Sequence, residues 1–183
     1  VEVIQLYATA LVMGEKFGDA ESLLIKASKE VSDPSITGRL VEVYLLAANQ
    51  QLVRAQRQLE SSSEDPAIRE SIEKCFASAA SVLMQAFKID PNNPQTLALI
   101  GAIGKVREVE RATFRREILK FIAEGQANSQ AFFTLGMLEG VSGNHEDAID
   151  YTRQALALRP ESTGAANNLA MFLIMKEMPT ASD

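Results

Sequence analysis

The chain has 183 residues, one His, one Cys, no Trp and a formal net charge of −6. Its 46% apolar and 23% charged residues are typical of a globular chain with a substantial core, which excludes general disorder. A single Cys excludes an internal disulfide and a cysteine-rich zinc site, and no apolar stretch is long enough to cross a bilayer. The acidic charge argues against nonspecific binding of nucleic acid.

The chain begins with Val1, and no charged and then apolar signal pattern follows it. We therefore expect an internal fragment of a larger protein or a processed chain. The compartment is left open, with the cytoplasm favoured.

Proline marks the starts of long segments with helical periodicity. Asp33-Pro34, Asp65-Pro66 and Asn93-Pro94 each place a side-chain oxygen at the N-cap and Pro at the first helical position. No stretch alternates apolar and polar residues over enough length to predict a strand. The predicted fold class is all-α.

Residues 1–34 are predicted to form the first helix hairpin. Apolar and small residues recur in it at helical spacing, namely Ile4, Tyr7, Ala8, Leu11, Ala20, Leu24 and Ala27. The alanines are expected where helices approach closely, because a larger side chain would overpack such a contact.

Residues 35–93 predict a second hairpin with elongated helices, at about 36–60 and 66–89, around a polar loop at 61–65. Apolar and small residues follow both helices at alternating spacings of three and four, which lets two antiparallel helices pack side by side. We expect this hairpin to form a protruding arm. The sequence leaves open whether the arm is a spacer or a docking element.

Residues 94–128 predict a third, degenerate hairpin whose second helix carries a basic cluster. Arg107, Arg111 and Arg115 follow a spacing of four and would share one helical face if no turn intervenes. Guanidinium groups hold carboxylates and phosphates, so an acidic peptide or another anion is one interpretation. Pairing with nearby Glu residues on an exposed helix is the simpler one. Nucleic acid is a further alternative, but no aromatic stacking platform accompanies the cluster.

Residues 129–162 form the clearest unit, which is 34 residues long. With Ser129 as position 1, large, small and proline residues occupy positions 4, 7, 8, 20, 27 and 32, namely Phe132, Leu135, Gly136, Ala148, Ala155 and Pro160. This pattern resembles the tetratricopeptide repeat (TPR), and the first hairpin matches it nearly in frame. Glu139 and Thr152 depart from it, since the family usually has large aromatic residues there. The resemblance implies an α-solenoid of antiparallel helix hairpins forming a TPR-like superhelix, with one elongated hairpin.

Residues 163–183 predict a single helix, which is a partial repeat or a cap. Apolar residues surround most of this helix, including Leu169, Phe172, Leu173 and Met175. Terminal repeats of solenoids normally have a polar outer face. We therefore expect that the intact protein continues, or that this helix pairs with another copy in a homo-oligomer, and Phe172→Asp is the substitution that the sequence suggests as a test.

The resemblance also implies a concave groove lined by the first helix of each hairpin, where the family binds peptides or helices. Positions 5, 9 and 12 carry over to Gln5, Thr9, Val12, Ala98, Ala102, Lys105, Phe133, Met137, Gly140, Asn167, Met171 and Ile174. Phe133 and Met137 are the expected apolar anchors, unless further helices of the protein cover them. Asn167 and Asn168 are expected to bond a peptide backbone. The family's terminal-carboxylate clamp is not reconstructed, since Gln5 and Thr9 occupy the comparable positions.

The remaining residues that could have a chemical role, Cys75 and His145, are better explained by packing. Cys75 occupies a core position between Ile72 and Ala79, which is typical of a small buried apolar residue. His145 lies in the turn of the clearest unit without a closed set of metal ligands around it. No catalytic motif is recognisable, so we expect no enzyme activity and no cofactor or metal site.

The sequence thus predicts a noncatalytic protein-protein interaction scaffold that binds a peptide or helix in its groove. One alternative is a regulatory or dimerisation region of a larger enzyme or transcription factor. The other is binding of an anion or nucleic acid through residues 105–120.

Overall fold

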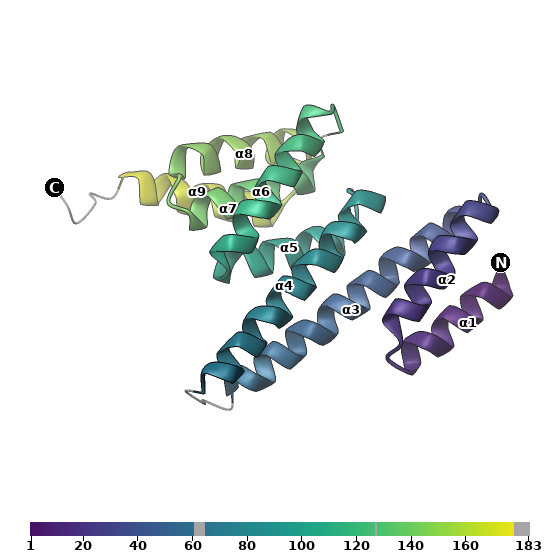
Figure 1. Ribbon diagram of the computed structural model, residues 1–183. Helices are drawn as coiled ribbons and strands as arrows, with labels where there is room; N and C mark the ends of the chain where they lie inside the picture. Colours follow the sequence, from purple (N-terminus) through teal and green to yellow (C-terminus); the bar gives the residue numbers. More distant parts are fainter. Residues whose placement is uncertain (61–64, 127, 178–183) are drawn as a thin grey trace. The chain divides into compact units, whose positions relative to one another are not determined.

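The computed structural model describes residues 1–60, 65–126 and 128–177. Every regular element in those ranges is an α-helix (Figure 1), in the order α1 (Glu2–Met13), α2 (Phe17–Glu30), α3 (Pro34–Glu60), α4 (Pro66–Ile89), α5 (Pro94–Val106), α6 (Glu108–Ala123), α7 (Ser129–Val141), α8 (His145–Leu158) and α9 (Thr163–Glu177). This confirms the all-α prediction. The expected loop at 61–64 and the end of the last expected unit, 178–183, lie outside the described residues.

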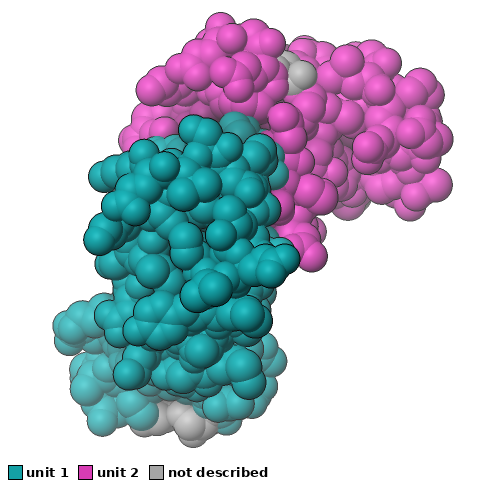
Figure 2. Space-filling view, turned by 90° about the vertical axis from the view of Figure 1, so that its right-hand side faces the viewer, with its two compact units in different colours: residues 1–91 teal, residues 92–183 magenta. Residues whose placement is uncertain are grey.

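The chain divides into two compact units (Figure 2), an N-terminal unit at residues 1–91 and a C-terminal unit at residues 92–183. Helices α1 to α4 build the first unit, and α5 to α9 build the second. In each unit, consecutive helices pack together, and alternate helices also touch, as α1 does with α3 and α5 with α7. This is the packing of stacked helix hairpins.

The predicted starts of three helices are formed by the expected capping groups. Asp65 Oδ1 accepts a hydrogen bond from Ala67 N at 2.8 Å, and Asn93 Oδ1 accepts one from Thr96 N at 3.0 Å. Asp33 Oδ1 accepts from the backbone nitrogen of Ser35 at 2.8 Å. These bonds satisfy amide groups that the first helical turn leaves without partners, and Pro follows each cap because its position needs no amide donor.

The small residues of the TPR-like pattern lie in the helix contacts. Ala8, Ala20 and Ala27 are buried in the N-terminal unit, as are Ala148 and Ala155 in the C-terminal unit. Close approach of the backbones leaves no room for larger side chains there, so the prediction for these positions is confirmed.

The second hairpin is elongated, as the sequence predicted. Helix α3 has 27 residues and α4 has 24, against 14 in α2. Figure 1 shows α1 and α2 alongside the N-terminal part of α3. In the distal part of the hairpin, Ala55 of α3 packs with Ile72 and Cys75 of α4, so Cys75 is the buried core residue that its spacing indicated.

Helices α2 and α3 are joined by a hydrogen bond that depends on protonation. The Tyr44 hydroxyl donates to Glu21 Oε1 at 2.8 Å, and burial together with this bond raises the pKa of Tyr44 above its usual value. Burial, with Asp147 and Glu139 nearby, also raises the pKa of Tyr151 in the C-terminal unit.

We expect the free energy of unfolding to fall as the pH rises above about 10, the usual tyrosine pKa, because the unfolded chain then releases protons that folded Tyr44 and Tyr151 retain. Tyr44→Phe should reduce this fall and cost about 1 kcal/mol at neutral pH through the lost hydrogen bond. Urea unfolding followed by circular dichroism at neutral and alkaline pH measures both effects. An equally steep fall in Tyr44→Phe would contradict this assignment.

Candidate functional site

An apolar hollow lies among α5, α7 and α9 of the C-terminal unit. Its volume is about 300 Å³. Most of its wall is aliphatic or sulfur-containing, and its lining includes Lys105 from α5, Met137 and Val141 from α7, and Asn168, Met171 and Met175 from α9. Methionine is unbranched and polarizable, so three methionines make a wall that adapts to apolar guests of different shape.

Glycines let the three helices approach closely enough to form this hollow. A Cβ at Gly101 of α5 would lie 2.6 Å from Cε of Met137, and one at Gly140 of α7 would lie 2.2 Å from the Phe172 ring. Phe172 is buried between α9 and the residues Ala148 and Ile149 of α8. Its ring therefore closes the inner end of the hollow instead of presenting an exposed surface.

Two polar groups at the hollow have no partner within the described part of the chain. Lys105 is exposed and makes no ion pair there, and the side chain of Asn168 is half-buried and makes no hydrogen bond there. An ammonium group and a carboxamide beside an apolar wall are suited to a carboxylate and to a peptide bond, respectively.

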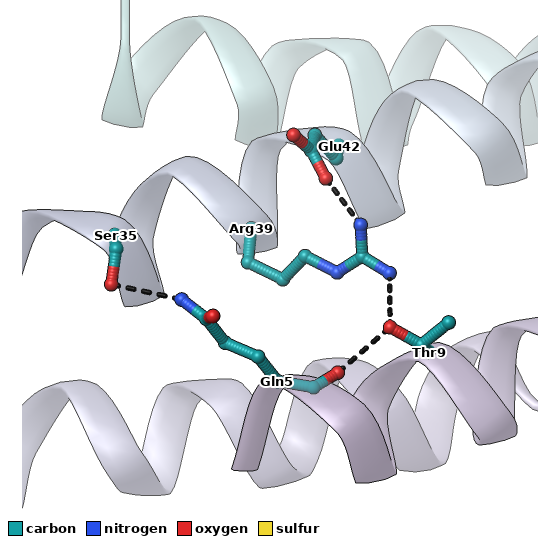
Figure 3. A network of polar contacts seen from close by, with 5 residues as sticks. All are labelled: Gln5, Thr9, Ser35, Arg39 and Glu42. Carbon is teal, nitrogen blue, oxygen red and sulfur yellow. Dashed lines mark hydrogen bonds and ion pairs between the residues drawn. The ribbon is translucent and has the colours of Figure 1, made fainter. Parts of the chain in front are cut away.

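A second, polar hollow lies between α1 and α3 of the N-terminal unit, with a volume of about 670 Å³. Figure 3 shows two bridges between these helices. Gln5 Nε2 donates to Ser35 Oγ at 2.9 Å, and Arg39 Nη2 donates to Thr9 Oγ1 at 2.6 Å. Thr9 Oγ1 in turn donates to the carbonyl of Gln5 at 2.8 Å, while Arg39 also pairs with Glu42.

The polar hollow has little unused binding capacity. Its other walls are Glu2, Leu6 and the open side of Gly38. The Arg39 guanidinium already donates to Thr9 and pairs with Glu42. Only its buried Nε lacks a partner among the described residues. These contacts mainly join α1 to α3.

The structure brings some of the expected groove residues together and separates others. Lys105, Met137 and Met171 share the apolar hollow, and Gln5 and Thr9 share the polar one. The expected residues outside both hollows are Val12, Ala98, Ala102, Phe133, Asn167 and Ile174.

Phe133 differs from the expectation for an exposed anchor. It is half-buried and packs against a cluster of Phe132, Ala155 and Ala165. Its ring also lies 3.6 Å from the Cβ position of Gly164 at the start of α9. The side chain therefore helps to attach α9 to α7.

The prediction that Phe172 is available on the surface of the last helix is wrong, because its side chain is buried. Leu173 and Met175 are exposed as the sequence predicted, and Met171 and Ile174 are exposed as well. Phe172→Asp would place a charge in the core and disrupt folding, so it cannot test association.

The basic cluster is divided by a turn. Arg107 lies between α5 and α6 and pairs with Glu110, with 3.4 Å between Nε and Oε2. Arg111 Nη1 donates to the carbonyl of Gly104 at 3.1 Å, and Arg115 pairs with buried Glu139. Because each guanidinium has a partner, their arrangement gives no support to an anion site or a nucleic-acid surface.

Arg39 and Met175 contribute to the hollows but were missed at the sequence level. Counting from Ser35 as position 1 of the elongated unit places Arg39 at position 5, which is a groove position in the other units. Met175 lies one residue beyond position 12 of the last unit, on the turn that follows Met171.

Within the described residues, no group of His, Cys, Asp and Glu side chains is placed to hold a metal ion. The same residues include no helix that is both long and apolar enough to cross a membrane. His145 begins α8 and is half-buried.

Comparison with known proteins identifies the fold. No protein-family model matches the sequence, and neither does any curated protein. The structure is similar to the crystal structure of TTC0263, a thermophilic TPR protein of Thermus thermophilus, with a TM-score of 0.52 and 16% identity over 94% of this chain and 98% of that one. MamA (41–end) from Desulfovibrio magneticus RS-1 gives a TM-score of 0.49 and 18% identity over 96% of this chain and 84% of its own. The chain thus has the TPR-like α-solenoid fold predicted from its repeats.

Proposed function

We propose that the protein is a noncatalytic interaction scaffold that binds a segment of another protein in the apolar hollow of its C-terminal unit. The observation that carries the proposal is the meeting of Lys105, Met137 and Met171 in one hollow. Each was expected in a peptide-binding groove from its repeat position alone. The TPR-like fold supports the proposal, because such folds present the first helices of successive hairpins as a binding surface.

The lining of the hollow indicates which segment fits. A large aliphatic or aromatic side chain can enter between the methionines, and its burial contributes about 1.5–3 kcal/mol. Asn168 can hydrogen-bond the backbone of the same segment. Lys105 favours an acidic residue beside the apolar one, which adds specificity more than affinity.

Selection from a library of displayed random peptides tests this function. We expect enriched peptides to combine one bulky apolar residue with a nearby Asp or Glu. Met171→Glu should weaken their binding about tenfold or more, because it places a charge against the apolar guest. Met171 is exposed, so this substitution leaves the core intact. Affinities are measured by isothermal titration calorimetry.

Two further variants make the test specific. Leu158→Glu adds the same charge to an exposed apolar position of α8 outside the hollow and should retain binding. Lys105→Glu should reverse the preference for acidic peptides. Equal binding to the wild type and Met171→Glu would place the interaction elsewhere and refute the proposal.

A further inference from the structure

Helix α1 carries an exposed apolar stripe on the face that α2 and α3 leave uncovered. The α1 stripe consists of Val3, Leu6, Tyr7, Ala10 and Met13. Val3 is 78% exposed, Leu6 70%, Tyr7 58% and Met13 82%. The stripe shares no residue with the apolar hollow of the C-terminal unit, and only Leu6 also borders the polar hollow.

The spacing of the α1 stripe indicates that its partner is a helix. Its residues recur at i, i+3, i+4, i+7 and i+10, which places them in one row along about three turns. The opposite face of α1 uses the same periodicity, with Ile4, Ala8 and Leu11, to pack inside the N-terminal unit. A row of this kind fits the ridges of one neighbouring helix.

The area of the α1 stripe is sufficient for a small symmetric interface. Four large side chains at these exposures present roughly 500 Å² of surface, the size of a functional patch on a monomer. Two copies of the stripe would bury about 1,000 Å², which is the lower limit for a specific protein interface.

The order of side chains favours an antiparallel pair of α1 helices. In that arrangement Val3 lies opposite Met13 of the second copy, and small Ala10 lies opposite Leu6 and Tyr7, so large and small residues alternate across the contact. The acidic Glu2 end of each α1 also lies beside the Lys16 end of the other, although Glu15 flanks that lysine. A parallel pair would instead oppose Tyr7 to Tyr7 and Glu2 to Glu2.

We propose that a second copy of this chain binds to the α1 stripe, forming a twofold symmetric dimer through antiparallel α1 helices. Such an interface uses the same patch on both copies and closes on itself. It replaces the pairing through the last helix that the sequence suggested. On α9, Leu173 and Ile174 form a shorter exposed patch, since Met171 and Met175 belong to the apolar hollow.

Sedimentation equilibrium of the 183-residue chain over a wide concentration range tests the dimer. The wild type should change from monomer to dimer as its concentration rises. Leu6→Glu and Tyr7→Glu should each weaken dimerisation about tenfold or more, because a charge then lies in the contact. Ile174→Glu on α9 is the matched control and should dimerise as the wild type does. Circular dichroism confirms that all variants remain helical.

Disulfide cross-linking tests the orientation. Val3→Cys and Met13→Cys, mixed and oxidised, should form a mixed dimer, whereas each alone should cross-link poorly. Native Cys75 is buried and gives little background. A monomer at every concentration, dissociation by Ile174→Glu but not by Leu6→Glu, or preferential cross-linking of Val3→Cys with itself would overturn the proposal. None of these results affects peptide binding at the apolar hollow.

Discussion

Arg115→Met is expected to lower the free energy of unfolding of the C-terminal unit by about 2–3 kcal/mol, near the lower limit for breaking a buried ion pair. Glu139 of α7 is fully buried, and Arg115 of α6 donates to its carboxylate. Methionine fills similar space but leaves the charge with one side-chain donor, Asn144 Nδ2 at 2.6 Å. The partial exposure of Arg115 limits the loss, since water can reach that side of the pair.

Glu139→Gln separates the effect of the buried charge from that of the contact. Glutamine keeps the shape and accepts a hydrogen bond, so we expect a loss of only about 1 kcal/mol. Urea unfolding measures both variants, and hydrogen exchange in α7 locates the change. If the two substitutions cost the same, the charge of Glu139 is not the cause. The hydrogen bond from Arg115 to Glu139 also raises the pKa of the guanidinium, which keeps this group charged.

Gly136→Ala is expected to destabilise the same unit by about 2 kcal/mol, the usual cost of overpacking a core. A Cβ at Gly136 would lie 2.5 Å from Thr152 Oγ1 and 3.2 Å from the carbonyl oxygen of Ala148. The Thr152 hydroxyl is buried and donates to that carbonyl at 2.6 Å, so it cannot move away without losing its hydrogen bond. The higher helix propensity of alanine, worth about 1 kcal/mol, offsets only part of this cost.

Gly38→Ala is the matched control on α3. Apart from the neighbouring backbone of α3 itself, no atom lies within 4 Å of a Cβ built there, so only the propensity gain remains. We expect Gly38→Ala to stabilise the N-terminal unit by about 0.5–1 kcal/mol. If thermal or urea unfolding shows that Gly136→Ala lowers the free energy of unfolding while Gly38→Ala raises it, packing is the cause of the loss at Gly136. A destabilising Gly38→Ala would show that helix propensity does not explain the difference.

The helices and their small contact residues could be predicted because both depend on local sequence. Pro34, Pro66 and Pro94 follow capping groups, and such caps act within one turn. Ala148 and Ala155 recur at fixed positions because every hairpin repeats the same close contact. These signals suffice for the fold class and the elongated hairpin.

The exposure of large apolar residues could not be predicted in the same way. Apolar residues surround α9, so periodicity does not separate buried Phe172 from exposed Ile174. The difference comes from Gly140 of α7, which leaves space for the Phe172 ring. Likewise, the sequence left open whether Phe133 anchors a partner or is covered by another helix, and its ring packs beside Gly164 of α9. A helical pattern identifies which residues share a face, whereas a neighbouring helix decides which are covered.

Partners that are distant in sequence also escaped prediction. Glu139 breaks the repeat pattern, and its ion pair with Arg115 spans 24 residues. Arg39 reaches Thr9 across 30 residues. Neither spacing belongs to a motif, so only the packed structure shows why these polar residues occupy their positions.

The unequal lengths of α2 and α3 have a consequence for how the N-terminal unit tolerates change. The distal cluster of Ala55, Ile72 and Cys75 comes from α3 and α4 alone. Adding or removing the same number of whole turns in both helices would therefore preserve the contacts that α3 makes with α1 and α2 at its other end. The length of this hairpin can therefore change without altering the contacts among α1, α2 and the N-terminal part of α3.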